Sequence, residues 1–244
     1  MTGMATSSNV TTLANYDLTV IQLNGNSPSP DILEKVSTAG FIRLQTDPEK
    51  VKATLAQLGE MLGKRISIIP LAHNSEQSGP SLPWHIDGYY QNPLPTYFML
   101  GCCFVQCRGG ATLLKDGRLI AARLLEDYPD LENVTIHYER TVPESYQERT
   151  LPLIQYLDET PILAYRSNIP KLPGLEQTIV NSGGFANEAE IYAIVDTAIE
   201  EAPIALEHHW QAGQILIAHN LFFLHSRKDY FGDRQMMRAQ CFSY

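Results

Sequence analysis

The spacing of hydrophobic residues changes along the chain near residue 65. Before this point, apolar side chains recur every three or four positions, as on one face of an amphipathic helix. Start signals at Ser29-Pro30 and Asp47-Pro48 predict two helices, each closed by a glycine. The first should cover Asp31–Ser37, and a short strand over Phe41–Leu44 should separate it from the second. The apolar stripe of the second helix consists of Val51, Leu55, Leu58 and Leu62.

Beyond residue 65, short runs of β-branched and aromatic residues dominate, with Gly, Pro and Asn between them. Two helical intervals interrupt this series, around Leu119–Tyr128 and Glu188–Glu200. Many short strands with turn signals indicate a sandwich or barrel, and the scattered helices argue against regular βαβ units. We therefore expect a mainly β protein with flanking helices, folded as a double-stranded β-helix (jelly roll). The predicted strands are Ile66–Ile69, Tyr97–Val105, Ala111–Leu114, Val134–Tyr138, Ile162–Tyr165, Ile204–Trp210, Ile215–Ala218 and Met236–Phe242.

The bulk composition narrows the classes of function. The 244 residues contain no Pro/Gly/Ser-rich linker, so we expect a flexible tail over residues 1–13 and a single domain over 14–244. A net charge of −9 without a Lys/Arg cluster argues against nucleic-acid binding, and no apolar run has the length of a membrane span. The first residues lack the pattern of a signal peptide, and the four cysteines favour buried, reduced thiols in a cytoplasmic protein. Nothing in the sequence indicates an oligomeric state.

Three candidate metal ligands stand out among the polar residues. His85 and Asp87 lie two positions apart, and His225 lies far along the chain. Residues i and i+2 of a strand project from the same face, so His85 and Asp87 can reach one ion while Ile86 points into the core. Two imidazoles and one carboxylate fill one face of an octahedral Fe(II) ion and leave the other face open. A His-x-Asp pair arises by chance about 0.3 times in a chain of this composition, so the alternative is a surface pair in which Asp87 orients the imidazole.

Further polar residues suit a second ligand. Gly109-Gly110 predicts a turn into a strand on which Thr112 is a hydroxyl donor, although threonine is also common in strands for packing alone. In the last strand, Arg234 and Arg238 bracket two methionines. A planar, permanently charged guanidinium suits the far carboxylate of a dicarboxylate that chelates iron. The alternative for each arginine is a solvated surface charge.

The conjunction of these motifs resembles the Fe(II)/2-oxoglutarate-dependent dioxygenases of the taurine dioxygenase-like branch, which includes clavaminate synthase and γ-butyrobetaine hydroxylase. The resemblance runs from Trp84 to Arg238 and therefore covers most of the chain. Two features depart from the family pattern: the interval between the distal histidine and the first arginine is short, and His219 stands where an Asp often precedes the Asn. The matching pieces, in order, are His85-x-Asp87, Gly109-Gly110-x-Thr112, Trp210-x-x-Gly213 with Asn220 ahead of His225, and Arg234-x-x-x-Arg238.

The resemblance implies a site and a reaction. His85, Asp87 and His225 would bind Fe(II), and Thr112 with Arg234 would hold the distal carboxylate of 2-oxoglutarate. With O2 as the second cosubstrate, the enzyme would hydroxylate, desaturate or cyclise a small molecule at an unactivated C–H bond and release succinate and CO2.

The residues that contact the prime substrate are the least constrained part of this interpretation. Arg238 stands where the family often meets an anionic group of the substrate, but the short interval leaves open an exchange of roles with Arg234. Tyr89 and Tyr90 directly follow Asp87 and should line the mouth of the site, with packing in the core as the alternative. Tyr165 and Arg166, on a later strand, are two further expected contacts. The polar loop His73–Leu82 suits a lid.

We therefore expect a small, carboxylate-bearing metabolite as substrate. Two alternatives belong to other classes. One is a non-catalytic jelly-roll protein that retains the fold and binds a metal or ligand. The other is a zinc hydrolase that uses the same three ligands. Zinc prefers tetrahedral sites and needs no clamp for a dicarboxylate, so Thr112 and Arg234 speak against the hydrolase.

Overall fold

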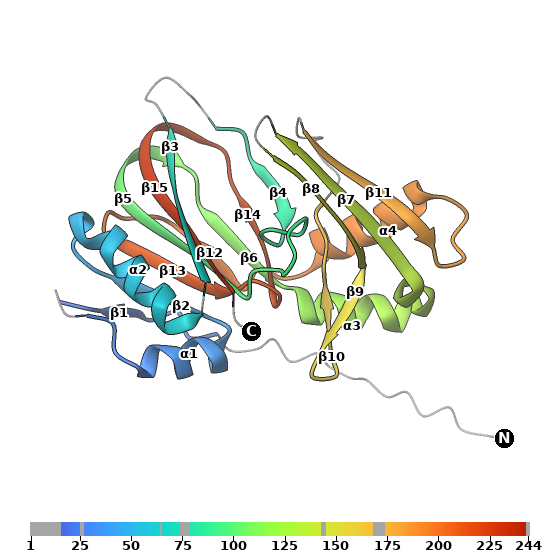
Figure 1. Ribbon diagram of the computed structural model, residues 1–244, viewed down its shortest axis with the longest axis horizontal. Helices are drawn as coiled ribbons and strands as arrows, with labels where there is room; N and C mark the ends of the chain where they lie inside the picture. The colour runs from blue at the N-terminus through green and yellow to red at the C-terminus, as the bar shows by residue number, and fades with distance from the viewer. Residues whose placement is uncertain are drawn as a thin grey trace.

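The computed structural model describes residues 16–24, 27–63, 65–73, 79–142, 145–167 and 174–242. The tail predicted over residues 1–13 lies outside these ranges. Strands dominate the described part of the chain and helices flank them, which confirms the prediction of a mainly β protein (Figure 1). The helices are α1 (Asp31–Ala39), α2 (Val51–Leu62), α3 (Gly117–Asp127) and α4 (Glu188–Glu201), with short 3-10 turns at Pro48–Lys50 and Pro129–Asn133.

The largest sheet has six strands in the order β1-β2-β13-β5-β15-β3. All neighbours in it are antiparallel except β1 and β2, which run parallel. Successive side chains of a strand point to opposite faces, so Arg234, Met236, Arg238 and Gln240 of β15 share one face. The strands are β1 (Val20–Gln22), β2 (Phe41–Gln45), β3 (Arg65–His73), β5 (Tyr97–Gly109), β13 (Gln214–His219) and β15 (Tyr230–Phe242).

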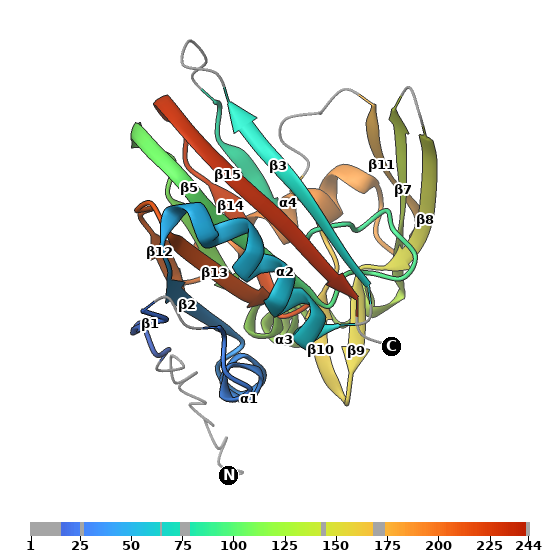
Figure 2. The same cartoon turned by 60° about the vertical axis from the view of Figure 1, so that its left-hand side comes forward.

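The two N-terminal helices cover the outer face of this sheet. Helix α2 lies across β15, β3 and β5, as the turned view shows (Figure 2). Its apolar stripe is buried, with Leu55 and Leu58 in one hydrophobic cluster with Ala239 and Cys241 of β15. This packing confirms the helix predicted from the spacing of its apolar residues.

A second sheet of four strands, in the order β12-β6-β14-β4, packs against the other face. Phe41 and Phe98 of the large sheet share a buried cluster with Leu114 and Phe223 of the small one, so the two sheets form a sandwich. Strand β4 is at an edge, with β14 as its neighbour. The strands are β4 (Leu82–His85), β6 (Thr112–Asp116), β12 (Leu206–His208) and β14 (Phe223–Arg227).

A third layer extends one end of the sandwich. Strand β7 (Val134–Val142) lies between β8 (Ser145–Pro152) and β11 (Leu175–Ser182), and α4 packs near this sheet (Figure 1). A hairpin of β9 (Ile154–Leu157) and β10 (Thr160–Leu163) follows β8, and β10 contacts α3.

Several strand boundaries differ from those predicted. The strand expected over Ile162–Tyr165 is observed as β10 and ends at Leu163, and the strand expected over Ile204–Trp210 shortens to β12. Half of the segment His73–Leu82, over which a lid is expected, lies outside the described residues, since 74–78 are not among them. All four cysteines are free thiols, as predicted, but Cys102 and Cys241 are buried whereas Cys103 and Cys107 are only partly buried. In the described part of the chain, no helix is long and apolar enough to span a membrane.

Candidate active site

The three predicted ligands converge between the two sheets. One potential ligand atom from each of His85, Asp87 and His225 lies within 4.8 Å of the others. Strand pairing produces this convergence, because His85 on β4 lies directly opposite His225 on β14. The Nε2 atoms of His85 and His225 lie 3.9 Å and 3.7 Å from Oδ1 of Asp87. Two imidazoles and a carboxylate thus face one point, as a facial metal triad requires.

The buried side-chain amide of Asn220, and not strand pairing, holds Asp87 in position. Strand β4 ends at His85, so the expected i, i+2 projection along one strand does not place the carboxylate. Instead, the Asp87 backbone N–H donates to Oδ1 of Asn220 at 2.7 Å, and Nδ2 of Asn220 donates to the Asp87 carbonyl at 2.9 Å. The same Nδ2 also donates to the Pro95 carbonyl at 2.9 Å. Asn220 therefore replaces a strand partner at the turn, while Ile86 is buried as predicted.

The two imidazoles are oriented by their neighbours. Nδ1 of His85 lies 2.8 Å from the carbonyl of Pro83, which makes it the protonated nitrogen and leaves Nε2 as the free lone pair. The His225 ring stacks on Phe98 of the large sheet, with ring centroids 4.2 Å apart. The centroids of His85 and His225 are also 4.2 Å apart. Both rings are thus held in place before any ligand binds.

The electrostatics of the triad suit a cation. Burial, and then the neighbouring His225, lower the pKa of His85 to about 3, so its ring is neutral and able to coordinate a metal at neutral pH. Burial acts to raise the pKa of Asp87, but Arg238 and the two histidines outweigh it and hold the pKa well below its ordinary value. The buried Oδ2 of Asp87 has no hydrogen-bond partner among the described residues. A divalent ion at this point would satisfy that oxygen and both Nε2 atoms, so the residues fit Fe(II).

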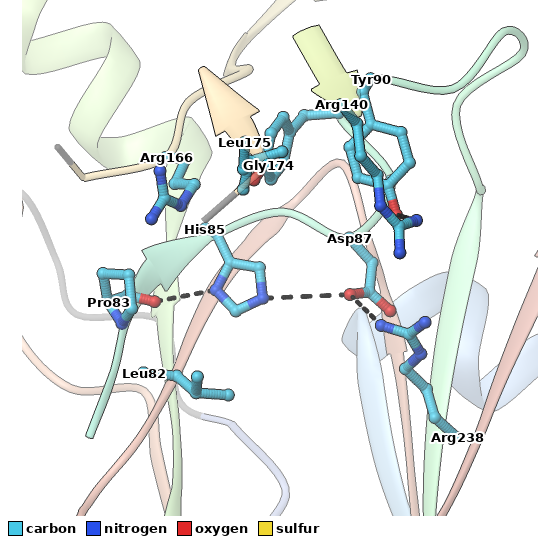
Figure 3. Close-up of a pocket in the computed structure, with 12 residues that line it drawn as sticks. Leu82, Pro83, His85, Asp87, Tyr90, Arg140, Arg166, Gly174, Leu175 and Arg238 are labelled. Atoms are coloured by element: carbon cyan, nitrogen blue, oxygen red, sulfur yellow. Dashed lines mark hydrogen bonds and ion pairs between the residues drawn. The ribbon is translucent and has the colours of Figure 1, made fainter. Parts of the chain in front are cut away.

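A pocket with a volume of about 260 Å³ is lined by two members of the triad, His85 and Asp87 (Figure 3). Four of the residues expected to contact the substrate line it: Tyr89, Tyr90, Arg166 and Arg238. Tyr165 does not line the pocket and lies in the hydrophobic core. Because adjacent residues of an extended chain point in opposite directions, Arg166 takes the side that faces the pocket and Tyr165 the side that faces the core.

Arg238 lines the pocket and also meets a protein carboxylate. Its Nη1 lies 3.4 Å from Oδ1 of Asp87, and its Nε is buried without a hydrogen-bond partner among the described residues. A charge-assisted hydrogen bond is normally about 2.7–2.9 Å long, so the contact with Asp87 is weak. Arg238 therefore retains hydrogen-bonding capacity toward the pocket.

The proposed cosubstrate residues lie near one another, on β15 and at the start of β6. Arg234 is buried on β15, donates from Nη1 to the carbonyl of Gly110 at 3.2 Å, and stacks 4.1 Å from the ring centroid of Tyr230. Thr112 is buried two residues after Gly110, and its Oγ1 accepts a hydrogen bond from Nε1 of Trp210 at 3.0 Å. Neither Arg234 nor Thr112 is among the residues that line the pocket in front of the triad.

Two features of the site were missed by sequence reasoning. Arg140 of β7 lines the pocket and donates to the hydroxyl of Tyr90 at 2.5 Å. It lies in a polar strand with no motif around it, so no local signal marks it. The hydrogen bond between Trp210 and Thr112 was also missed, although both residues belong to the motifs that carry the family resemblance.

The chain matches the family model described as "Taurine catabolism dioxygenase TauD, TfdA family" over residues 24–240. No curated protein sequence matches it. Solved structures with a similar fold include PvcB from Pseudomonas aeruginosa, at 19% identity and a TM-score of 0.66 over 90% of this chain and 82% of that one. A second structure of PvcB, described as an Fe, alpha-ketoglutarate dependent oxygenase from an isonitrile synthetic pathway, gives 17% identity and a TM-score of 0.67, with 91% and 82% coverage. A taurine dioxygenase from Burkholderia xenovorans has 15% identity and a TM-score of 0.65, over 90% of this chain and 84% of that one.

At these identities the structures establish a shared fold, and the family match carries the assignment. The match covers most of the chain and includes all three residues of the triad. The chain therefore belongs to the TauD, TfdA family of dioxygenases.

Proposed function

We propose that the protein oxidises an unactivated C–H bond of a small, carboxylate-bearing metabolite in the cytoplasm, by hydroxylation, desaturation or ring formation, and releases succinate and CO2. The observation that carries this proposal is the convergence of His85, Asp87 and His225 beside a pocket that contains guanidinium groups. Membership of a dioxygenase family favours it over a zinc hydrolase or a non-catalytic binding protein. The six- and four-stranded sheets would be the two layers of a double-stranded β-helix.

His85, Asp87 and His225 would hold the iron through two imidazole Nε2 atoms and the Asp87 carboxylate. Fe(II), together with 2-oxoglutarate and O2, supplies the oxidant that attacks an unactivated C–H bond. The hydrogen bond from His85 to Pro83 and the stacking of His225 on Phe98 would keep both rings in the geometry for coordination.

Thr112 and Arg234 would hold the distal carboxylate of 2-oxoglutarate. Arg234 has a buried Nε without a hydrogen-bond partner among the described residues, which is a donor suited to a carboxylate. The hydrogen bond from Trp210 occupies a lone pair of the Thr112 hydroxyl and leaves its proton free to donate. An Arg234→Lys change keeps the charge but loses the fork, so it should weaken binding of 2-oxoglutarate.

Arg238 would bind the carboxylate of the prime substrate, with Tyr89, Tyr90 and Arg166 forming further parts of the wall. Arg238 lies next to Asp87, which puts a carboxylate bound there close to the metal. Such an anchor would orient the C–H bond that reacts while the tyrosine rings exclude water.

Anaerobic titration tests this proposal. Addition of Fe(II) and then 2-oxoglutarate to the protein should produce the weak visible charge-transfer band of the chelate, and O2 should then yield succinate. Asp87→Ala should abolish both signals, because it removes the one carboxylate of the triad. Asp127→Ala, at an exposed carboxylate on α3, is the matched control and should behave like the unchanged protein. Failure of the unchanged protein to bind 2-oxoglutarate would refute the proposed function.

A further inference from the structure

Arg227 lies on β14, two residues beyond the candidate ligand His225. The pairing of β14 with β6 puts Arg227 directly opposite Thr112. Residues that face each other across two strands project from the same side of the sheet, and so do residues i and i+2 of one strand. Arg227, Thr112 and His225 therefore share a face. That face looks toward the large sheet, because the His225 ring stacks on Phe98 of β5.

The spacing along this face suits a ligand that extends from the metal to Thr112. Two residues of a strand span about 6.6 Å, which is close to the length of a five-carbon diacid. A diacid that chelated a metal at His225 through one end would bring its far carboxylate to the level of Thr112. Arg227 stands at that same level, because it is the direct partner of Thr112 in the sheet.

Arg227 and Arg234 lie against the same aromatic ring. The Cζ atoms of Arg227 and Arg234 are 4.9 Å and 4.1 Å from the ring centroid of Tyr230. Gly79 and Tyr230 exchange two backbone hydrogen bonds of 3.1 Å, and a Cβ added at Gly79 would overlap the tyrosine ring. The ring thus packs directly on backbone. Stacking on it brings two guanidinium groups from different sheets together.

These two guanidinium groups retain hydrogen-bonding capacity. Neither forms an ion pair within the described part of the chain. Arg227 donates from Nη2 to the carbonyl of Pro80, and Arg234 donates from Nη1 to the carbonyl of Gly110. The Nε atom of each is buried and has no hydrogen-bond partner among the described residues. An anion with two acceptor oxygens is the ligand that such groups bind best.

We infer that Arg227 binds the distal carboxylate of the cosubstrate together with Arg234 and Thr112, and makes the site selective for a 2-oxo acid that has a second carboxylate. The inference rests on the proposed function and adds a residue to its cosubstrate site. Nε and Nη1 of Arg227 would donate to the carboxylate, since Nη2 is bound to Pro80. Thr112 and Arg227 would bind from the small sheet and Arg234 from the large one.

Two acids that differ only at the far end test the inference. The anaerobic protein with Fe(II) is titrated with 2-oxoglutarate and with 2-oxopentanoate, which has a methyl group in place of the distal carboxylate. The charge-transfer band of each chelate measures its binding. Arg227→Gln should weaken binding of 2-oxoglutarate by about tenfold or more, as for a hydrogen bond to a charged group. The affinities for 2-oxopentanoate and for Fe(II) should stay within about twofold, because neither ligand contacts Arg227.

Two further variants separate charge from geometry. Lys228→Gln is the matched control, since it removes one positive charge from the neighbouring residue, which is exposed and pairs with Glu207 at 2.6 Å. This variant should bind 2-oxoglutarate like the unchanged protein. Arg227→Lys keeps the charge but loses the fork, and should weaken binding of 2-oxoglutarate by about threefold or more. It provides the test even if glutamine disturbs the strand.

Three results would overturn the inference. One is an equal loss of affinity for both acids in Arg227→Gln, which would show that Arg227 only supports the strand. Another is an affinity for 2-oxoglutarate that stays within about threefold in that variant. The third is an equal loss in Lys228→Gln, which would show an effect of overall charge. Failure of the unchanged protein to bind 2-oxoglutarate would instead count against the proposed function itself.

Discussion

Replacement of Asn220 by alanine should damage the site through the backbone of Asp87. The Asn220 side chain is fully buried and forms three hydrogen bonds, two to the backbone of Asp87 and one to the carbonyl of Pro95. An Asn220→Ala change removes all three and leaves a buried N–H donor and two carbonyl acceptors with one partner fewer. The turn that presents the Asp87 carboxylate would lose the contact that replaces strand pairing.

The size of the effect follows from these bonds. At about 1 kcal/mol for each, the three hydrogen bonds stabilise the folded protein by about 3 kcal/mol. Residues that orient metal ligands typically change metal affinity by about 10- to 100-fold when removed. Asn220→Asp should be at least as harmful, since a carboxylate would face the carbonyl oxygens of Asp87 and Pro95 without a proton to donate.

Urea unfolding of the metal-free protein measures the first effect, and titration with Fe(II) measures the second. The control is Asn181→Ala. Asn181 is exposed, its Oδ1 accepts one hydrogen bond from the backbone N–H of Gly183 at 3.1 Å, and its loss should change stability by less than about 0.5 kcal/mol. A loss below about 1 kcal/mol in Asn220→Ala, with unchanged metal affinity, would refute the role assigned to this amide.

Three further outcomes are expected. Trp210→Phe removes the donor to the Thr112 hydroxyl and should weaken 2-oxoglutarate binding by about fivefold, as for one hydrogen bond, with metal affinity unchanged in the same titration. Gly110→Ala should also weaken 2-oxoglutarate binding, because Gly110 has a φ of 74° and an added Cβ would lie 2.9 Å from Nη1 of Arg234. Unchanged 2-oxoglutarate binding would show that Arg234 does not hold the cosubstrate. Burial, then nearby positive charge, lower the pKa of His208 to about 4 from 6.5, so the unfolded chain takes up a proton that the folded protein does not. The stability that the neutral His208 ring contributes should be complete above pH 6.5 and decline by up to about 1.4 kcal/mol per pH unit as the pH falls toward 4. In urea unfolding, His208→Gln should reduce this dependence of stability on pH.

The sequence predicts elements best where one face of an element is buried. Helix α2 and strand β13 follow their hydrophobic patterns closely, because packing in the sandwich core selects those residues. Strands β8 and β11 were not predicted. They carry many polar and exposed residues, and pairing with β7 on either side defines them more than their own composition does.

The same distinction applies to the site. The residue types of the triad are dictated by metal chemistry, so His85, Asp87 and His225 could be selected from the sequence. Arg140 could not, because its position over the pocket arises from the stacking of a separate sheet beside β4. Tyr165 shows a related limit: the sequence indicates that a segment reaches the pocket, but the choice between neighbouring side chains depends on strand direction, which places Tyr165 in the core.

The direct pairing of His85 with His225 across β4 and β14 has a consequence for how the site tolerates change in chain length. Two of the three candidate ligands are brought together by register, and the long stretch of chain between them plays no part in their spacing. Insertions or deletions in the loops of that stretch would leave the ligands opposite each other. A slip of one residue between β4 and β14 would turn one imidazole to the far face of the sheet and abolish the site.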